Sequence, residues 1–187
     1  ANIFSKVEQN FLMESDISEM TTLVPYIVTD SVPKLGIMTA LRFLEWVSEN
    51  REGVISLSSD KSLKNLIHYT HHFLDTWNEN ETKKVLERYG LDGLRKPDLS
   101  GLQFVQMDEF YPISPKQHNS FYNYVTKNYI EGFGLDPNRA LFINSDEIKL
   151  YKDKSYREVF PDYSIDLSLR YRQANRSEEH TSELQSP

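Results

Sequence analysis

Three short apolar runs, separated by amphipathic stretches, dominate the pattern of hydrophobic and polar positions along this chain. The runs cover residues 54–57, 102–107 and 140–143 and are rich in branched and aromatic side chains. Between them apolar residues recur at helical spacing, and glycine, proline and asparagine mark the turns. Alternating strands and helices predict an α/β fold with an open, Rossmann-like, mostly parallel sheet and helices on both faces.

The strongest amphipathic helix is expected just before the first apolar run. Pro33 suits a first helical turn, and Ile37, Leu41 and Leu44 then fall on one face, so this helix should be a core element. Residues 1–33 also hold apolar side chains at helical spacing. We interpret that segment as an arm packed on the domain.

The second apolar run leads directly into two carboxylates, Asp108 and Glu109. Its nearly continuous apolar character predicts a strand buried on both faces. Ligands of open α/β sheets bind beyond the carboxyl ends of the strands, so both acids are expected at a site. An Asp leaving a buried strand should be partly desolvated, which raises its basicity. Asn119 or Ser120 can then cap the following helix.

The polar turn after the first run is a second candidate site. It carries Ser59, Asp60, Lys61 and Ser62 between an expected strand and the start of a helix. Unpaired N–H groups and the helix dipole favour an anion such as phosphate at this position. The carboxylate of Asp60 would repel a phosphate, and Lys61 would offset part of that repulsion. The alternative is an ordinary turn in which Ser59 or Asp60 caps the helix without any ligand.

Residues 104–124 resemble the glucosamine-6-phosphate deaminase/isomerase family. They share a strand, a Met-Asp-Glu-aromatic motif, a loop containing a His, and Asn-Ser-Phe-Tyr at a helix start, and a weaker likeness extends over 35–175. The resemblance implies that Asp108 moves the C2 proton of an open-chain amino sugar. It also implies that the turn at Ser59 holds the sugar phosphate, although the glycine and prolines usual there are absent. Related 6-phosphogluconolactonases typically carry Arg where this chain has Phe110.

Three functions stay open at this point. In the first, glucosamine 6-phosphate is isomerised and deaminated to fructose 6-phosphate and ammonia, and Glu109 joins the turn residues 59–62 in binding the substrate. The second is a non-catalytic sugar-phosphate binding or sensing protein, and the third is a hydrolase like 6-phosphogluconolactonase. A nucleotide-dependent oxidoreductase is disfavoured because the chain has no G-x-G-x-x-G motif.

The resemblance also bears on cofactors and partners. It implies no cofactor, a phosphorylated amino sugar as the ligand, and a possible homo-oligomer of the full-length protein. His68, His71 and His72 have spacings that could bind zinc, but we interpret them as packing or surface residues, so no metal site is expected.

Composition disfavours other classes of partner. The chain has 21 basic and 28 acidic residues and a net charge of −7, so neither nucleic acid nor an anionic membrane is expected as a partner. Zero cysteines exclude disulfides and thiolate metal sites within it. No apolar run reaches the roughly 18 residues of a membrane span, and there is no signal-peptide core. A soluble, cytoplasmic protein is expected.

Residues 176–187 read differently from the rest of the chain. They match one reading frame of a widely used DNA sequencing adapter, so we expect a non-native tail. The expected organisation is an arm at 1–33, a partial sugar-phosphate isomerase-like α/β domain at 34–175, and this tail. The resembled family continues with a second glycine-rich loop and further acid–base residues. The resemblance therefore implies that the carboxyl-terminal part of the fold is missing and that this fragment is inactive.

Overall fold

The computed structural model describes residues 4–14, 26–59 and 61–159. The chain divides into two compact units, Ala1–Met107 with Thr126–Leu141 and Asp108–Val125 with Phe142–Pro187. Asp60 and the expected tail at 176–187 lie outside the described residues. None of the helices in the described ranges is long and apolar enough to cross a membrane.

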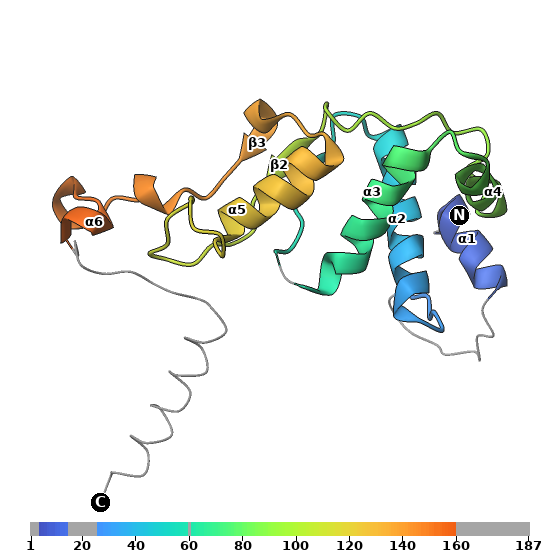
Figure 1. Ribbon diagram of the computed structural model, residues 1–187, viewed down its shortest axis with the longest axis horizontal. Helices are drawn as coiled ribbons and strands as arrows, with labels where there is room; N and C mark the ends of the chain where they lie inside the picture. The colour runs from blue at the N-terminus through green and yellow to red at the C-terminus, as the bar shows by residue number, and fades with distance from the viewer. Residues whose placement is uncertain (1–3, 15–25, 60, 160–187) are drawn as a thin grey trace, which may run out of the picture. The chain divides into compact units, whose positions relative to one another are not determined.

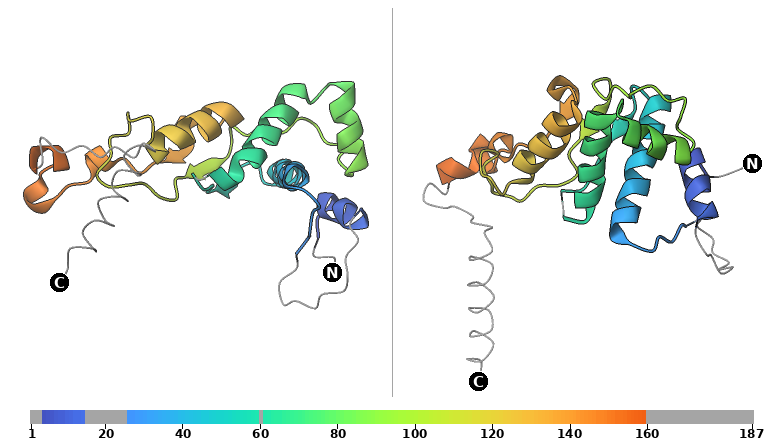
Figure 2. Two further views of the ribbon diagram at one scale, coloured as in Figure 1. Left: turned by 60° about the horizontal axis from the view of Figure 1, so that its bottom comes forward. Right: turned by 45° about the vertical axis from the view of Figure 1, so that its right-hand side comes forward.

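Three helices of the first unit lie side by side, with the second between the other two (Figure 1, Figure 2): α1 (Lys6–Met13), α2 (Val32–Glu49) and α3 (Lys64–Thr76). The predicted face of α2 is buried, since Leu41 and Leu44 are both 0% exposed. Val7 and Phe11 of α1 are also fully buried. The apolar positions of both helices therefore build the core of this unit.

The three predicted strands form one parallel sheet in the order β1-β2-β3: β1 (Val54–Ile55), β2 (Gln103–Val105) and β3 (Ala140–Leu141). The register places Ile55 beside Phe104, and Phe104 beside Ala140. Each strand lies within one of the apolar runs and is shorter than the run. The prediction of an open, parallel, Rossmann-like sheet is confirmed.

One face of this sheet is packed more closely than the other. Ile55 and Phe104 are 7% and 1% exposed, whereas Val54 and Leu141, on the opposite face, are 60% and 68% exposed. Gln103 is exposed as well, so the prediction of a second strand buried on both faces is wrong. Side chains alternate between the two faces of a strand, and the polar Gln103 marks the open face. Helices over that second face stay a prediction.

Two glycines end helices where the pattern predicted them to end. Helix α4 (Asn80–Arg88) is followed by Gly90 with φ of +76°, and Gly134, with φ of +70°, follows the helical stretch that contains η2 (Thr126–Glu131), a π-helical turn. A residue with a side chain is strained in this left-handed conformation, which favours glycine at a helix end. The 3₁₀ turn η3 (Pro137–Arg139) then leads into β3.

The described part of the second unit has four short helical elements: α5 (Phe121–Val125), η4 (Ser145–Glu147), η5 (Tyr151–Asp153) and α6 (Tyr156–Val159). A buried hydroxyl joins two of its segments. Ser145, which is 1% exposed, donates its hydroxyl to the carbonyl oxygen of Ile113. This hydrogen bond holds the loop after Asp108 and Glu109 against the start of η4.

Candidate functional site

The turn after β1 contains a buried hydroxyl without a partner. Ser59 is 7% exposed, and its Oγ makes no hydrogen bond within the described chain. Burial of an unpaired hydroxyl costs about 1–3 kcal/mol. Lys61 and Ser62 in the same turn are exposed to solvent. The free protein therefore holds an unused hydrogen-bonding group at one of the predicted site residues.

Helix α3 begins next to this turn without a side-chain cap. Its N-cap residue is Leu63, whose apolar side chain makes no capping hydrogen bond. The 3₁₀ turn η1 (Lys61–Leu63) separates Ser59 from the helix. Ser59 therefore does not cap α3. This excludes Ser59 as the helix cap in the alternative of an ordinary turn. A helix start of this kind keeps its partial positive charge available to an anion.

Asp108 follows β2 at the carboxyl end of the middle strand, as the sequence predicted. Its side chain is exposed, and Met107 before it is 58% exposed. The expected desolvation of Asp108 is thus absent from the described residues, although Gln106, the first residue after β2, is 3% exposed. Asp108 and Ser59 belong to different units, so the prediction that they approach each other stays a prediction.

The carboxylate of Glu109 accepts hydrogen bonds from backbone N–H groups of its own unit. Its Oε1 accepts hydrogen bonds from the N–H groups of Phe110 and Phe121, at 2.9 and 3.0 Å, and its Oε2 accepts one from Tyr122 at 2.7 Å. Phe121 and Tyr122 are the first residues of α5, whose N–H groups have no partner inside the helix. Glu109 was predicted to bind the substrate or support the site. Its geometry is that of a carboxylate that fixes the start of α5.

The two residues predicted to cap α5 play different parts. The Oγ of Ser120 accepts a hydrogen bond of 3.0 Å from the N–H of Asn123, which is the expected capping geometry. The side-chain oxygen and nitrogen of Asn119 are instead buried without a hydrogen-bond partner within the described chain. Asn119 therefore does not cap α5.

A solved structure is similar to this chain in its fold. The chain is similar to the structure of a monomeric glucosamine-6-phosphate deaminase, called a missing link of the NagB superfamily, with a TM-score of 0.52 and 14% identity. The chain has a Rossmann-like, NagB-type fold. The match covers 71% of this chain and 48% of that one, so the chain spans about half the length of the enzyme it matches. No protein-family model and no curated protein matches the sequence.

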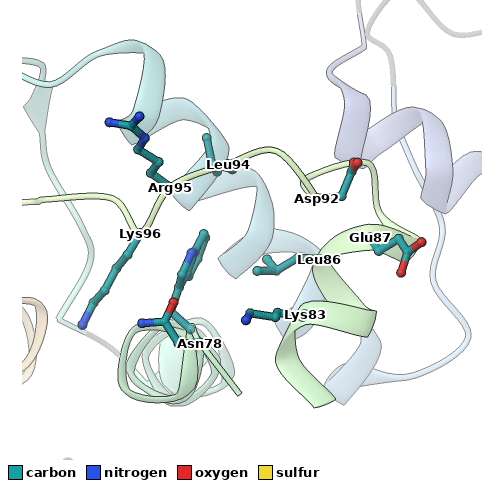
Figure 3. Close-up of a pocket in the computed structure, with 9 residues that line it drawn as sticks. Asn78, Lys83, Leu86, Glu87, Asp92, Leu94, Arg95 and Lys96 are labelled. Atoms are coloured by element: carbon teal, nitrogen blue, oxygen red, sulfur yellow. The ribbon is translucent and has the colours of Figure 1, made fainter. Parts of the chain in front are cut away.

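The first unit also has a surface cavity away from the predicted site residues. It measures about 430 Å³ and lies beside Trp77, with Asn78, Lys83 and Lys96 among its lining residues (Figure 3). Side chains of both charges line it, because Glu87, Asp92 and Arg95 also contribute. All five charged side chains are exposed. The cavity therefore has no strong preference for an anion.

Two side chains on packed helix faces make specific polar contacts. Tyr129, on η2, donates its hydroxyl to the carbonyl oxygen of Ser58 at 2.6 Å. His71, on α3, has Nε2 3.1 Å from the carbonyl oxygen of Asn128, and its ring meets Phe133 edge-on. Helical spacing alone identifies both residues as lying on a packed face. Their polar partners come from distant parts of the chain and leave no local pattern.

Proposed function

We propose that this chain is part of a sugar-phosphate enzyme of the glucosamine-6-phosphate deaminase type. In this proposal Ser59, Lys61 and Ser62 bind the phosphate group of the substrate. Asp108 is the base that moves a proton between C2 and C1. The NagB-type fold supports this choice among the hypotheses left open by the sequence.

The observation that carries the proposal is the buried Oγ of Ser59, which has no hydrogen-bond partner among the described residues, close in sequence to the start of α3, where Leu63 provides no side-chain cap. A phosphate oxygen placed there would accept a hydrogen bond from this hydroxyl and lie in the favourable field of the helix start. The cost of the unpaired hydroxyl would then disappear on binding. Lys61, which is exposed next to it, would add a cation at the rim.

Strand order supports a role for Asp108 in the same reaction. β1 and β2 are parallel neighbours, so the turn carrying Ser59 and the segment leading to Asp108 leave the sheet from the same edge. In the proposed reaction the carboxylate removes the C2 proton of the open-chain amino sugar and returns it to C1. The C1 aldehyde thereby becomes an alcohol and the C2 amine an imine, and water hydrolyses the imine to give fructose 6-phosphate and ammonia. A base for this transfer needs hydrogen-bond reach of the carbon that loses its proton.

A second candidate is a sugar-phosphate binding or sensing protein without catalysis. The exposure of Asp108 favours it, because a carboxylate that removes a proton from carbon is expected to be partly withdrawn from water. Asp60, where the resembled family has glycine, also weakens the case for an efficient enzyme. Both candidates require phosphate recognition, and they differ only in turnover.

Binding and turnover are tested separately. Calorimetric titration should show that glucosamine 6-phosphate binds about tenfold or more tightly than glucosamine, because only the former carries the phosphate. Equal affinity for the two sugars would contradict the proposal.

Ammonia release from glucosamine 6-phosphate is then measured for this chain and for the complete natural gene product. Asp108→Asn in the active version should leave sugar-phosphate affinity nearly unchanged and reduce turnover by orders of magnitude. Sugar-phosphate binding without turnover in either version would favour the binding protein.

A further inference from the structure

The turn at the proposed phosphate site is held from inside the core by one tyrosine. Tyr129 is 0% exposed, and its hydroxyl donates a 2.6 Å hydrogen bond to the carbonyl oxygen of Ser58, the residue before Ser59. Its ring packs against Phe104 of β2 and against Phe133, with ring centroids 5.7 and 5.5 Å away. A side chain locked by such packing keeps its hydroxyl at one position.

This hydrogen bond also sets the direction of the peptide that enters Ser59. The Ser58–Ser59 bond is not among the cis peptides of the described chain, so its carbonyl and its N–H point in opposite directions. Since the carbonyl of Ser58 faces the buried Tyr129, the N–H of Ser59 is directed away from it. The orientation of Ser59 therefore depends on a hydroxyl 71 residues away along the chain.

The same π-helical turn also contacts helix α3. Tyr129 and Asn128 both lie in the π-helical turn η2, a geometry that often accompanies functional sites. The ring of His71, on α3, hydrogen-bonds the carbonyl oxygen of Asn128 at 3.1 Å. Ser58, which follows β1, and His71, within α3, are thus both hydrogen-bonded to residues of η2.

We propose that Tyr129 is a positioning residue that holds the turn at Ser58 and Ser59 in the orientation that binds phosphate. The ligand part of this proposal rests on the proposed function. The positioning part stands on the contacts of the free protein. Loss of the hydroxyl should loosen the turn first and weaken phosphate binding as a consequence.

The variant Tyr129→Phe tests this, because it keeps the packed ring and removes only the hydroxyl. Tyr89→Phe is the matched control: Tyr89 is also buried, at 7% exposed, and donates its hydroxyl to Glu14 at 3.2 Å, far along the chain from the turn. Amide hydrogen exchange of residues 58–63 is measured first, without ligand. We expect exchange about fivefold or more faster in Tyr129→Phe and unchanged in Tyr89→Phe.

Affinity for glucosamine 6-phosphate is measured next on the same proteins. Tyr129→Phe should bind about fivefold more weakly than the parent chain, and Tyr89→Phe should bind equally well. Unchanged exchange in Tyr129→Phe, or equal effects of the two variants, would overturn the positioning role. If the parent chain binds no sugar phosphate while exchange changes as expected, positioning is supported and the proposed function fails instead.

Discussion

The Oε2 of Glu109 accepts a hydrogen bond of 2.7 Å from the backbone N–H of Tyr122. The same carboxylate also binds the N–H of Phe121 at 3.0 Å, so one side chain fixes the first two residues of α5. Glu109 immediately follows Asp108, so this contact also anchors the proposed base. Glu109 therefore supports Asp108 indirectly, by holding the backbone at the start of α5.

Removal of this carboxylate should destabilise the protein. Glu109→Ala leaves N–H groups of α5 unpaired, and we expect a loss of about 1–2 kcal/mol in the free energy of unfolding measured with urea. Glu109→Gln keeps a side-chain oxygen and should lose less. The control is Glu87→Ala, at an exposed position of α4. Equal stabilities of the two alanine variants would show that Glu109 does not hold α5.

Much of the fold was predictable from the sequence because it rests on local patterns. The three apolar runs contain the three parallel strands, and the apolar spacing around Leu41 and Leu44 gave the correct face of α2. Ser120 also has the residue type and position of a helix cap. The periodicity of apolar residues, the capping residues and the turn residues determine these features. Each of them acts within a few residues of the position concerned.

The sequence-based predictions are wrong or incomplete where contacts between distant parts of the chain determine the structure. Glu109 reaches a helix that starts 12 residues later, and Tyr129 reaches the turn at Ser58, so neither partner follows from nearby sequence. The open face of β2 could have been recognised, because Gln103 interrupts the apolar run. Gln103 is one of two glutamines among the four apolar residues of the run, and its polar side chain lies on the exposed face of the strand.

Gly132 should not tolerate a side chain, because a Cβ there would clash with the ring of His71, lying 2.6 Å from its Cε1. Alanine in place of helical glycine usually stabilises by about 0.5–1 kcal/mol. Here Gly132→Ala should instead destabilise by about 1–3 kcal/mol in urea unfolding. In a His71→Ala background the cost of Gly132→Ala should largely vanish. A stabilised single variant would contradict the packing of α3 against this helix.

A hydrogen bond in the loop before β2 makes the free energy of unfolding depend on pH. The N–H of Ser100 donates a 3.0 Å hydrogen bond to Asp98, and bonding to Ser100 lowers the pKa of the Asp98 carboxyl. The stabilisation is therefore present above the unfolded-state pKa of about 3.9 and is lost as the pH falls through the folded-state value. The stability advantage of the parent chain over Asp98→Ala should shrink between about pH 5 and pH 2. A constant or growing advantage in urea unfolding would refute this.

Asp60 is the residue of the turn that should oppose phosphate. Asp60→Gly removes one negative charge beside the ligand, which is worth roughly 1 kcal/mol or more at partial exposure, so affinity for glucosamine 6-phosphate should rise several-fold. Asp92→Gly makes the same charge change at an exposed position of the loop before β2 and should have little effect. Unchanged or weaker binding by Asp60→Gly in calorimetry would count against phosphate recognition at this turn.

The central claim is that the buried hydroxyl of Ser59 is kept for a ligand, and Ser59→Ala tests it most directly. The measurement pairs urea unfolding of the free protein with calorimetric binding of glucosamine 6-phosphate, and Ser56→Ala, at an exposed position just upstream, is the control. Because the hydroxyl has no partner within the described chain, its removal should leave the free protein equally or more stable. Binding should weaken about tenfold, while Ser56→Ala changes neither quantity. A Ser59→Ala protein that is less stable but binds the sugar phosphate as well as the parent chain would contradict the account.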